Sequence, residues 1–582
     1  MTIRGSALLF TGLVLALTAC EDSSSAPTPS PATPATPTPA ESAANAAAIA
    51  KAHEPSALFA QVRNGAVDEW LTDEPGFARY LGFHDADGKV PDLSKDGIQA
   101  HIGWLHREET ALARVDPKGL SEDDLLDLAI LKQHVDRALF DLVAMNAHHK
   151  SPQFYQDELG VNVYLDIEYA PLAIRANGLV EQEEASLKQI PHIKENLELP
   201  LSKPVAEVAA RNAAGFATYL RTDVVKALKD VGDAAFKERF TKANEALATA
   251  SDELAKWLKT TVIPTGDQSH VLGPMRYAKL LEVQEGLKMP LPEFKAIADK
   301  DLAENEASYQ AVVKSAKATR PSAKTLLEVA RTQVEESRAF VLEHKLLTLP
   351  FPDEKLLVRE TPAYERWNLA SIDTPGPFET ERRAFYQITL PDVAWPKKEQ
   401  DDYVPEYGTL LATTVHETYP GHFVQFQFVA KAPTKVQKMA GSYSFIEGWA
   451  HYTEQLMLAE EGFKKDDPQY RLGQAKDALL RDCRFLASIG IHTEGMTVEQ
   501  ATKLFEDKCH VDHASAREQA TRGTFDPGYF AYTLGKLEIL KLREEAKKKL
   551  GDKFSLQRFH DALLSHGSPP VALIHDRVLS EL

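Results

Sequence analysis

The sequence is poor in cysteine, has no excess of positive charge and contains only one long hydrophobic run. Three Cys among 582 residues cannot form the disulfide framework of a small secreted domain. The chain has 66 Lys and Arg against 85 Asp and Glu, a formal net charge of −19. Because nucleic-acid phosphates bind basic surfaces, this charge argues against nucleic acid as a partner. The single apolar run lies at the N-terminus, which excludes a polytopic membrane protein.

The N-terminus has the organisation of a bacterial signal sequence. Arg4 supplies positive charge, an apolar run extends from Ala7, and Leu17-Thr18-Ala19-Cys20 resembles the lipobox. We therefore predict that residues 1–19 are removed and that Cys20 is lipidated, which attaches the protein to a membrane outside the cytoplasm. An uncleaved anchor or an ordinary secretory signal is the alternative.

Residues 20–50 are rich in Pro, Ser, Ala and Thr, with six prolines between Pro27 and Pro39. Such a segment has little to bury, so we predict an extended tether. Residues 51–582 form the folded body, with a division into two lobes near residue 350 as an option. An extracytoplasmic compartment permits a disulfide between Cys483 and Cys509, although two separate thiols are equally compatible with the sequence.

The body is predicted to be mainly α. With 43% hydrophobic and 26% charged residues the chain can bury a core, and apolar residues recur at helical spacing. Examples are Leu128, Leu131 and Val135, behind Ser121 as a predicted N-cap. A second apolar stripe consists of Leu327, Ala330 and Val334, and a predicted capping box consists of Thr497 and Gln500.

Strand patterns are confined to Lys355–Arg359 and Arg383–Leu390, ahead of the most informative motif. They predict a small antiparallel β ribbon near the candidate active-site helix. Its edge could align an extended peptide, or the ribbon could be a solvent-facing hairpin without a role.

The motif itself places His416 and Glu417 at the end of an apolar helical stretch, followed by Pro420, Gly421 and His422. In zinc hydrolases with the HExxH motif, two histidines four residues apart bind the metal and the glutamate acts on water. A spacing of six would turn the second histidine roughly 120° away on an unbroken helix. Pro420 removes a helical N–H and Gly421 permits unusual backbone angles, so we predict a bend that returns His422 to the metal.

A later segment supplies a third ligand. On a helix, Glu447, His451 and Glu454 share one face. We assign Glu447 as the ligand and Glu454 as the partner that orients a ligand histidine. His451 with Glu454 is then an ordinary solvated pair.

Several segments together resemble the bacterial family called domain of unknown function 885. They are HETYPGH, IEGWAHYTE, RDCRFLASIGIHTEGMTVEQA, DPGYFAYTLGKLEIL and FHDALLSHGSPP, in order across residues 409–571. That family is similar to helical zinc metallopeptidases with an HExxPGH motif. The resemblance implies a helical, cleft-containing hydrolase with Zn²⁺ as cofactor and peptides as substrates. It also implies that His416, His422 and Glu447 bind the metal and that Glu417 is the general base.

The sequence departs from the family pattern at two positions. Phe423 replaces a second histidine that often follows the Pro-Gly-His, and Tyr529 replaces a frequent glutamine. The second change bears on substrate preference more than on catalysis.

The late segment offers groups for the reaction and the substrate. Tyr529, Tyr532 and Lys536 step along one helix face. We predict that Tyr532 stabilises an oxyanion, that His492 is a second candidate for that role or for a fourth ligand, and that Tyr529 and Lys536 contact substrate. A structural histidine is the alternative for His492.

Arg481, Arg484 and Arg522 are candidate clamps for a peptide carboxylate, with surface ion pairs as the alternative. The sequence thus predicts a zinc-dependent hydrolase of peptide bonds, anchored as a lipoprotein. A catalytically silent lipoprotein that binds a peptide or a partner, and a zinc hydrolase of a non-peptide amide or ester, are the alternatives.

Overall fold

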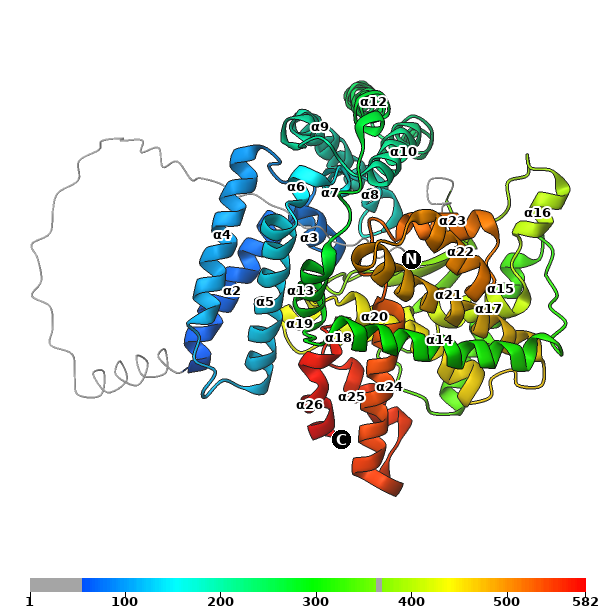
Figure 1. Ribbon diagram of the computed structural model, residues 1–582. Coiled ribbons are helices and arrows are strands. Elements are labelled where there is room, and N and C mark those ends of the chain that lie inside the picture. Colours follow the sequence, from blue (N-terminus) through cyan, green and yellow to red (C-terminus); the bar gives the residue numbers. More distant parts are fainter. Residues whose placement is uncertain (1–54, 363–368) are drawn as a thin grey trace, which may run out of the picture.

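The computed structural model describes residues 55–362 and 369–582, and most of them lie in helices (Figure 1). A small sheet of three strands is the other regular structure of this part of the chain. The mainly α fold predicted from the sequence is therefore confirmed. The predicted signal sequence, Cys20 and the tether lie outside the described residues.

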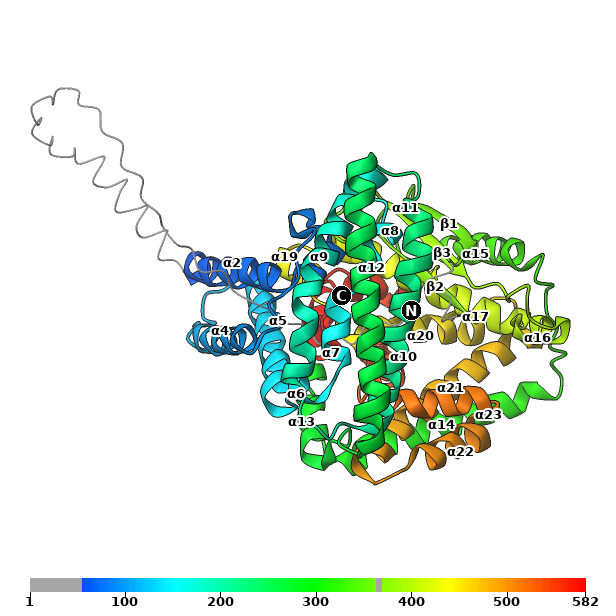
Figure 2. The ribbon, with the colours of Figure 1, turned by 90° about the horizontal axis from the view of Figure 1, so that it is seen from above.

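The first half of the chain forms two groups of helices. The first group, α2, α4 and α5, lies at one end of the molecule, with α5 packed against the other two (Figure 1). In the second group α12 packs against α9 and α10, and Figure 2 shows these three long helices side by side. The helices of this half are α2 (Pro55–Asp73), α3 (Pro75–Leu81), α4 (Lys95–Ala113), α5 (Glu122–Leu139), α6 (Ala147–Lys150), α7 (Gln153–Gln156), α8 (Val163–Asp166), α9 (Leu172–Asn196), α10 (Lys203–Tyr219), α11 (Val225–Leu228), α12 (Ala234–Trp257) and α13 (Gly273–Glu285).

The second half is organised around α21, which packs against α14, α17 and α22, and around the pair α20 and α24. The helices of this half are α14 (Leu291–Val313), α15 (Leu326–Glu343), α16 (Lys397–Tyr403), α17 (Tyr407–Glu417), α18 (His422–Lys431), α19 (Lys435–Met439), α20 (Tyr443–Gln455), α21 (Pro468–Thr493), α22 (Val498–Cys509), α23 (His513–Arg522), α24 (Ala531–Leu550), α25 (Leu556–Leu564) and α26 (Val571–Glu581). The largest hydrophobic core takes side chains from both sides of residue 350, and the division there stays a prediction.

Helix ends follow the local chemistry of the sequence. The Ser121 side chain accepts a hydrogen bond from the Asp124 amide at the start of α5, and Thr497 with Gln500 forms a complete capping box at the start of α22. Each cap satisfies a backbone N–H that the helix itself leaves unpaired. Both predicted helix starts are confirmed.

The sheet differs from the predicted antiparallel ribbon. The two predicted strands, β1 (Lys355–Glu360) and β3 (Arg383–Ile388), pair in parallel. A short strand between them in the sequence, β2 (Ala370–Asp373), reverses the chain direction and pairs antiparallel with β3, so the order is β1-β3-β2. The Tyr386 hydroxyl on β3 lies 3.1 Å from that of Thr414 on α17, which ties the sheet to the helix that carries His416.

Helices α20 and α24 approach each other at two glycines. A Cβ on Gly535 would lie 1.8 Å from the Ser444 carbonyl oxygen, and one on Gly448 would lie 2.4 Å from the Gly535 Cα. Only glycine permits such close backbone contact. The contact sets the position of Glu447 on α20 relative to Tyr532 on α24.

Across the described residues, no helix combines the length and apolar character needed to span a bilayer. Cys483 on α21 and Cys509 on α22 form a disulfide, with Cα atoms 6.4 Å apart, so the paired state permitted by the sequence is the one observed. The bond joins α22 to the helix that carries Arg481 and Arg484.

Replacing Cys483 and Cys509 together by alanine is expected to lower the free energy of unfolding by about 3.5 kcal/mol. The bond closes a loop with a sequence separation of 26, and a cross-link of that span restricts the unfolded chain by this amount. Urea unfolding with and without a reducing agent measures the effect. The reductant should destabilise the native protein and leave the double variant unchanged, whereas an equal response of both would contradict the prediction.

Candidate metal centre

The chain bends sharply between His416 and His422. Helix α17 ends at Glu417 and α18 begins at His422, so the helix stops before Pro420 as predicted. The Gly421 amide donates to the Val415 carbonyl at 3.2 Å, and a Cβ at Gly421 would lie 1.9 Å from the His416 carbonyl oxygen. The chain can therefore fold back onto its own helix only because residue 421 has no side chain.

The bend brings both imidazoles to the carboxylate of Glu447. The Nε2 atoms of His416 and His422 are 3.2 Å apart, and the Glu447 Oε2 lies 3.3 Å from the first and 3.6 Å from the second. Ligand atoms held at ~2.0–2.1 Å by a tetrahedral zinc ion lie roughly 3.4 Å from one another. The three atoms thus form a triangle of the size that one such ion needs, and all three residues are buried.

The hydrogen bonding of Glu447 also fits a cation. No well-aligned hydrogen bond reaches either carboxylate oxygen from another described residue, although the side chain is only 1% exposed. A buried carboxylate without donors is costly, and a divalent ion would offset that cost. Burial raises the pKa of Glu447, but the adjacent His416 and His422 outweigh this and hold it well below its usual value.

Glu454 orients the first ligand histidine. Its Oε1 lies 2.6 Å from Nδ1 of His416, and Arg481 pairs with the same oxygen at 2.9 Å. An Nδ1–H that donates to Glu454 leaves the Nε2 lone pair directed at the triangle. In the absence of a metal ion, burial lowers the pKa of His416, but the adjacent carboxylates of Glu447 and Glu454 outweigh it and raise the pKa to about 9. The Nε2 lone pair then becomes available when a metal ion displaces the proton. Burial raises the pKa of Glu454, but Arg481 and His416 outweigh this effect and lower that pKa well below its usual range.

His451 also contacts Glu454, with its Nδ1 3.4 Å from Oε2. The predicted pairing is confirmed, but the prediction that the pair is solvated is wrong, because both side chains are buried. They lie in the interface that α20 forms with α24 and α21, and burial lowers the pKa of His451 to about 3.

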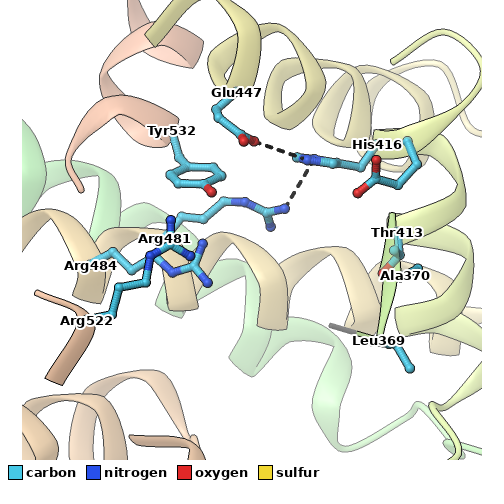
Figure 3. A pocket seen from close by; sticks show the side chains of 10 residues that line it. Leu369, Ala370, Thr413, His416, Glu447, Arg481, Arg484, Arg522 and Tyr532 are labelled. Carbon is cyan, nitrogen blue, oxygen red and sulfur yellow. Dashed lines mark hydrogen bonds and ion pairs between the residues drawn. The ribbon is translucent and has the colours of Figure 1, made fainter. Parts of the chain in front are cut away.

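A cavity of about 160 Å³ opens beside the triangle (Figure 3). Its lining residues are Leu369, Ala370, Thr413, His416, Glu417, Glu447, Arg481, Arg484, Arg522 and Tyr532. Glu417, buried to 3% exposure, thus faces the same space as the histidine that precedes it. Figure 3 shows the Tyr532 ring between Glu447 and the arginine side chains.

The three arginines on this wall have different partners. Arg481 is paired with Glu454, and Arg522 pairs with Asp526 at 3.0 Å, so both form ion pairs. The pair of Arg481 is buried, however, and not on the surface as the alternative expected. Arg484 donates through Nε to the Gln519 side-chain oxygen at 2.9 Å.

Three other predicted site residues are held by other contacts. His492 has its ring nitrogens 3.1 and 2.8 Å from the backbone carbonyls of His270 and Gly523, and burial lowers its pKa to about 4. Lys536 is buried in an ion pair with Asp301 at 2.6 Å. Neither lines the cavity. Tyr529 does not line the cavity either, but its ring packs against Arg484 and Arg522, which do.

Sequence reasoning missed several residues of the site. Leu369 and Ala370 were missed because they lie at the start of strand β2, which was not predicted from the sequence. Thr413 could have been predicted as a cavity residue, because it precedes His416 and Glu417 by about one helical turn. Trp449 donates from Nε1 to the Pro420 carbonyl at 3.0 Å and so fixes the bend. Asp477, behind Arg481, has its pKa raised to about 6 by burial.

Comparisons with other proteins connect this architecture to two solved structures. A candidate lipoprotein of unknown function from Shewanella oneidensis is 25% identical, with a TM-score of 0.73 over 90% of this chain and 99% of its own. A candidate lipoprotein from Colwellia psychrerythraea is 17% identical, with a TM-score of 0.66 over 91% of this chain and 100% of its own, and shares the fold. None of the curated proteins is similar enough in sequence to count as a relative.

The sequence profile of one family matches residues 75–578, which include every element of the metal centre. Since this match covers most of its length, the chain belongs to the family described as bacterial protein of unknown function (DUF885).

Proposed function

We propose that this protein is a zinc-dependent hydrolase of peptide bonds, held on a membrane surface outside the cytoplasm by a lipid on Cys20. The observation that carries the proposal is the triangle of His416, His422 and Glu447, whose donor atoms lie 3.2–3.6 Å apart. Buried imidazoles and a carboxylate at this spacing are the donor set of zinc enzymes. A structural site closes with four protein ligands, whereas three ligands beside a cavity leave a position for water or substrate.

Bound Zn²⁺ would supply a water of pKa ~7 and would polarise the substrate carbonyl. Glu417 faces the cavity next to His416 and accepts a proton from the attacking water. The water oxygen bonds to the carbonyl carbon, the C–N bond breaks, and Glu417 returns the proton to the leaving nitrogen. The Tyr532 hydroxyl donates to the oxygen on which negative charge develops.

The sheet supports an extended peptide as substrate. Strand β2 lies at an edge of the sheet, and among the described residues no strand pairs with its other side. Leu369 and Ala370, at its start, line the cavity. A peptide added along such an edge would be aligned by main-chain hydrogen bonds with its carbonyl near the metal ligands.

Metal analysis of the purified protein tests the proposal. We expect one zinc per chain, and loss of that zinc in His422→Ala and Glu447→Ala. His575→Ala, which removes a partly exposed imidazole paired with Glu545, is the matched control and should keep the metal. An anomalous-scattering map of the crystal should place the ion between the three ligands.

Activity is then measured on peptides and on acylated non-peptide amides and esters, with and without a chelator. Chelator-sensitive cleavage of peptides supports the proposal, and cleavage of the acylated compounds alone favours the non-peptide hydrolase. A protein that takes up no zinc under metal-replete conditions would overturn the hydrolase and favour a silent binding protein.

Cys20→Ser is expected to release the protein from the membrane fraction. The lipobox-like sequence and the similarity to candidate lipoproteins support a lipid at this residue. Cell fractionation and labelling with a fatty-acid analogue measure the effect. Ser24→Ala, a change within the tether, serves as control. Equal membrane retention of the Cys20 variant would contradict the lipid anchor.

A further inference from the structure

Resting on the proposed function, we infer that Arg484 binds a free carboxylate of the substrate, so that the enzyme removes one or two residues from the C-terminal end of a peptide. Arg484 lines the same cavity as His416, Glu417 and Glu447. The inference depends on the charge of this arginine, on how it is held and on how close it lies to the metal ligands.

Among the described residues, Arg484 is the cavity arginine without an ion pair, although Asp477 interacts with it electrostatically at longer range. Arg481 and Arg522 each have a carboxylate partner, Glu454 and Asp526. No carboxylate of a described residue lies within 4.0 Å of the Arg484 guanidinium, whose hydrogen bond goes to the neutral amide of Gln519. In a chain with a net charge of −19, a cation on a cavity wall that is not held in an ion pair with a described residue is suited to an anion from outside.

The guanidinium is also held in place before any ligand arrives. It lies 5.0 Å from the ring centroids of both Tyr529 and Tyr532. Gln519 accepts from its Nε, and the Tyr529 hydroxyl donates to the same Gln519 oxygen, which fixes that acceptor. With Nε engaged, the terminal nitrogens make no hydrogen bond to another described residue and can take a carboxylate in bidentate fashion.

The position of Arg484 limits the length of what it can hold. Arg481 contacts the ligand His416 at 3.2 Å, and the Tyr532 ring packs against both Arg481 and Arg484. Arg484 and Arg481 lie about one helical turn apart on α21, and their guanidinium groups lie 5.0 and 5.7 Å from the centroid of the same tyrosine ring. Each extended residue spans ~3.3–3.6 Å, so one or two residues fit between the carboxylate and the bond that is cut. The cavity of about 160 Å³ agrees with so short a leaving peptide.

Arg522 lines the same cavity. It packs 4.8 Å from the Tyr529 ring centroid and is tied to the Tyr443 hydroxyl at 3.0 Å. Because Arg522 is already paired with Asp526, it should bind a further carboxylate less strongly. We therefore assign binding of the substrate carboxylate to Arg484.

The test compares N-acetyl-Ala-Ala-Phe with its C-terminal amide. Binding of each to the zinc-loaded Glu417→Gln protein is measured by calorimetry, because this variant should bind without turnover. We expect the acid to bind about 10–100-fold more tightly than the amide, the range of a charge-assisted hydrogen-bond pair. Arg484→Gln should remove that preference and leave amide binding unchanged, and Arg484→Lys should restore part of it.

Arg239→Gln is the matched control, since this exposed arginine pairs with Glu184 away from the cavity. Mass spectrometry of the products from native protein should show loss of one or two C-terminal residues. Equal binding of acid and amide, or equal cleavage of both, would overturn the carboxylate site while leaving the hydrolase intact. An acid preference that depends on Arg484, without cleavage of either peptide, would support the carboxylate site and overturn the hydrolase.

Discussion

Replacing Glu417 by glutamine is expected to lower peptide turnover by about 10²–10⁴-fold, the contribution of a positioned general base. The amide has the shape of the carboxylate but cannot accept a proton from water. Glu417 lines the cavity yet lies outside the triangle of metal ligands, so zinc content should stay at that of the native protein. The rate with a cleaved peptide and the zinc content of the same sample measure the two effects.

Glu183→Gln provides a matched control for this experiment. Glu183 is fully buried on α9, and burial, with a smaller contribution from Glu184, raises its pKa to about 9. Its carboxyl group is therefore already neutral at pH 7, and an amide should replace it with little effect on rate. An unchanged rate in Glu417→Gln would remove the base assignment, and a loss of zinc there would instead make Glu417 a ligand.

Replacing Gly421 by alanine is expected to abolish stoichiometric zinc binding and to destabilise the fold by about 1–3 kcal/mol or more, the range for overpacking. The new methyl group would lie 1.9 Å from the His416 carbonyl oxygen and 2.4 Å from that of Val415. Both are backbone atoms of α17 and cannot move without shifting His416. The turn would have to open, and His422 would leave the triangle. Zinc titration and urea unfolding measure the two effects.

Gly215→Ala separates this effect from a general response to alanine. Gly215 lies on the exposed face of α10, and a Cβ added there would have no atom within 4 Å. Because alanine has the higher helix propensity, the change should raise the free energy of unfolding by up to ~1 kcal/mol. Normal zinc binding by Gly421→Ala would mean that His416 and His422 converge without the tight turn at residue 421.

The sequence predicted those features that depend on a few neighbouring residues. Ser121 and Thr497 cap their helices because a side-chain oxygen can reach an amide two or three residues later. The helix stops ahead of Pro420 because an imino acid cannot continue it. Glu447 was assigned as the third ligand from its helix face, and the resemblance to a family implied the same set of His416, His422 and Glu447.

Features that depend on distant partners could not be predicted in the same way. Strand β2 has four residues, and only its pairing with β3 gives it a regular structure. Helical spacing correctly put Tyr532 and Lys536 on one helix, but it wrongly put Tyr529 there too, because α24 begins at Ala531 and Tyr529 lies in the turn before it. The spacing also could not show what each side chain would contact. Lys536 meets Asp301 of α14, and Tyr532 meets the cavity. The ion pair of Arg481 likewise depends on Glu454, which another helix brings to it, whereas Arg522 pairs with Asp526 only four residues later.

The backbone contact between Gly448 and Gly535 constrains how this protein could be redesigned. Glu447 and Tyr532 sit beside these glycines, so their separation is set by two main chains already in contact. Larger or smaller side chains nearby cannot widen or narrow that side of the cavity. Variation in specificity, whether natural or engineered, is therefore left to the opposite side, where Leu369 and Thr413 present replaceable side chains.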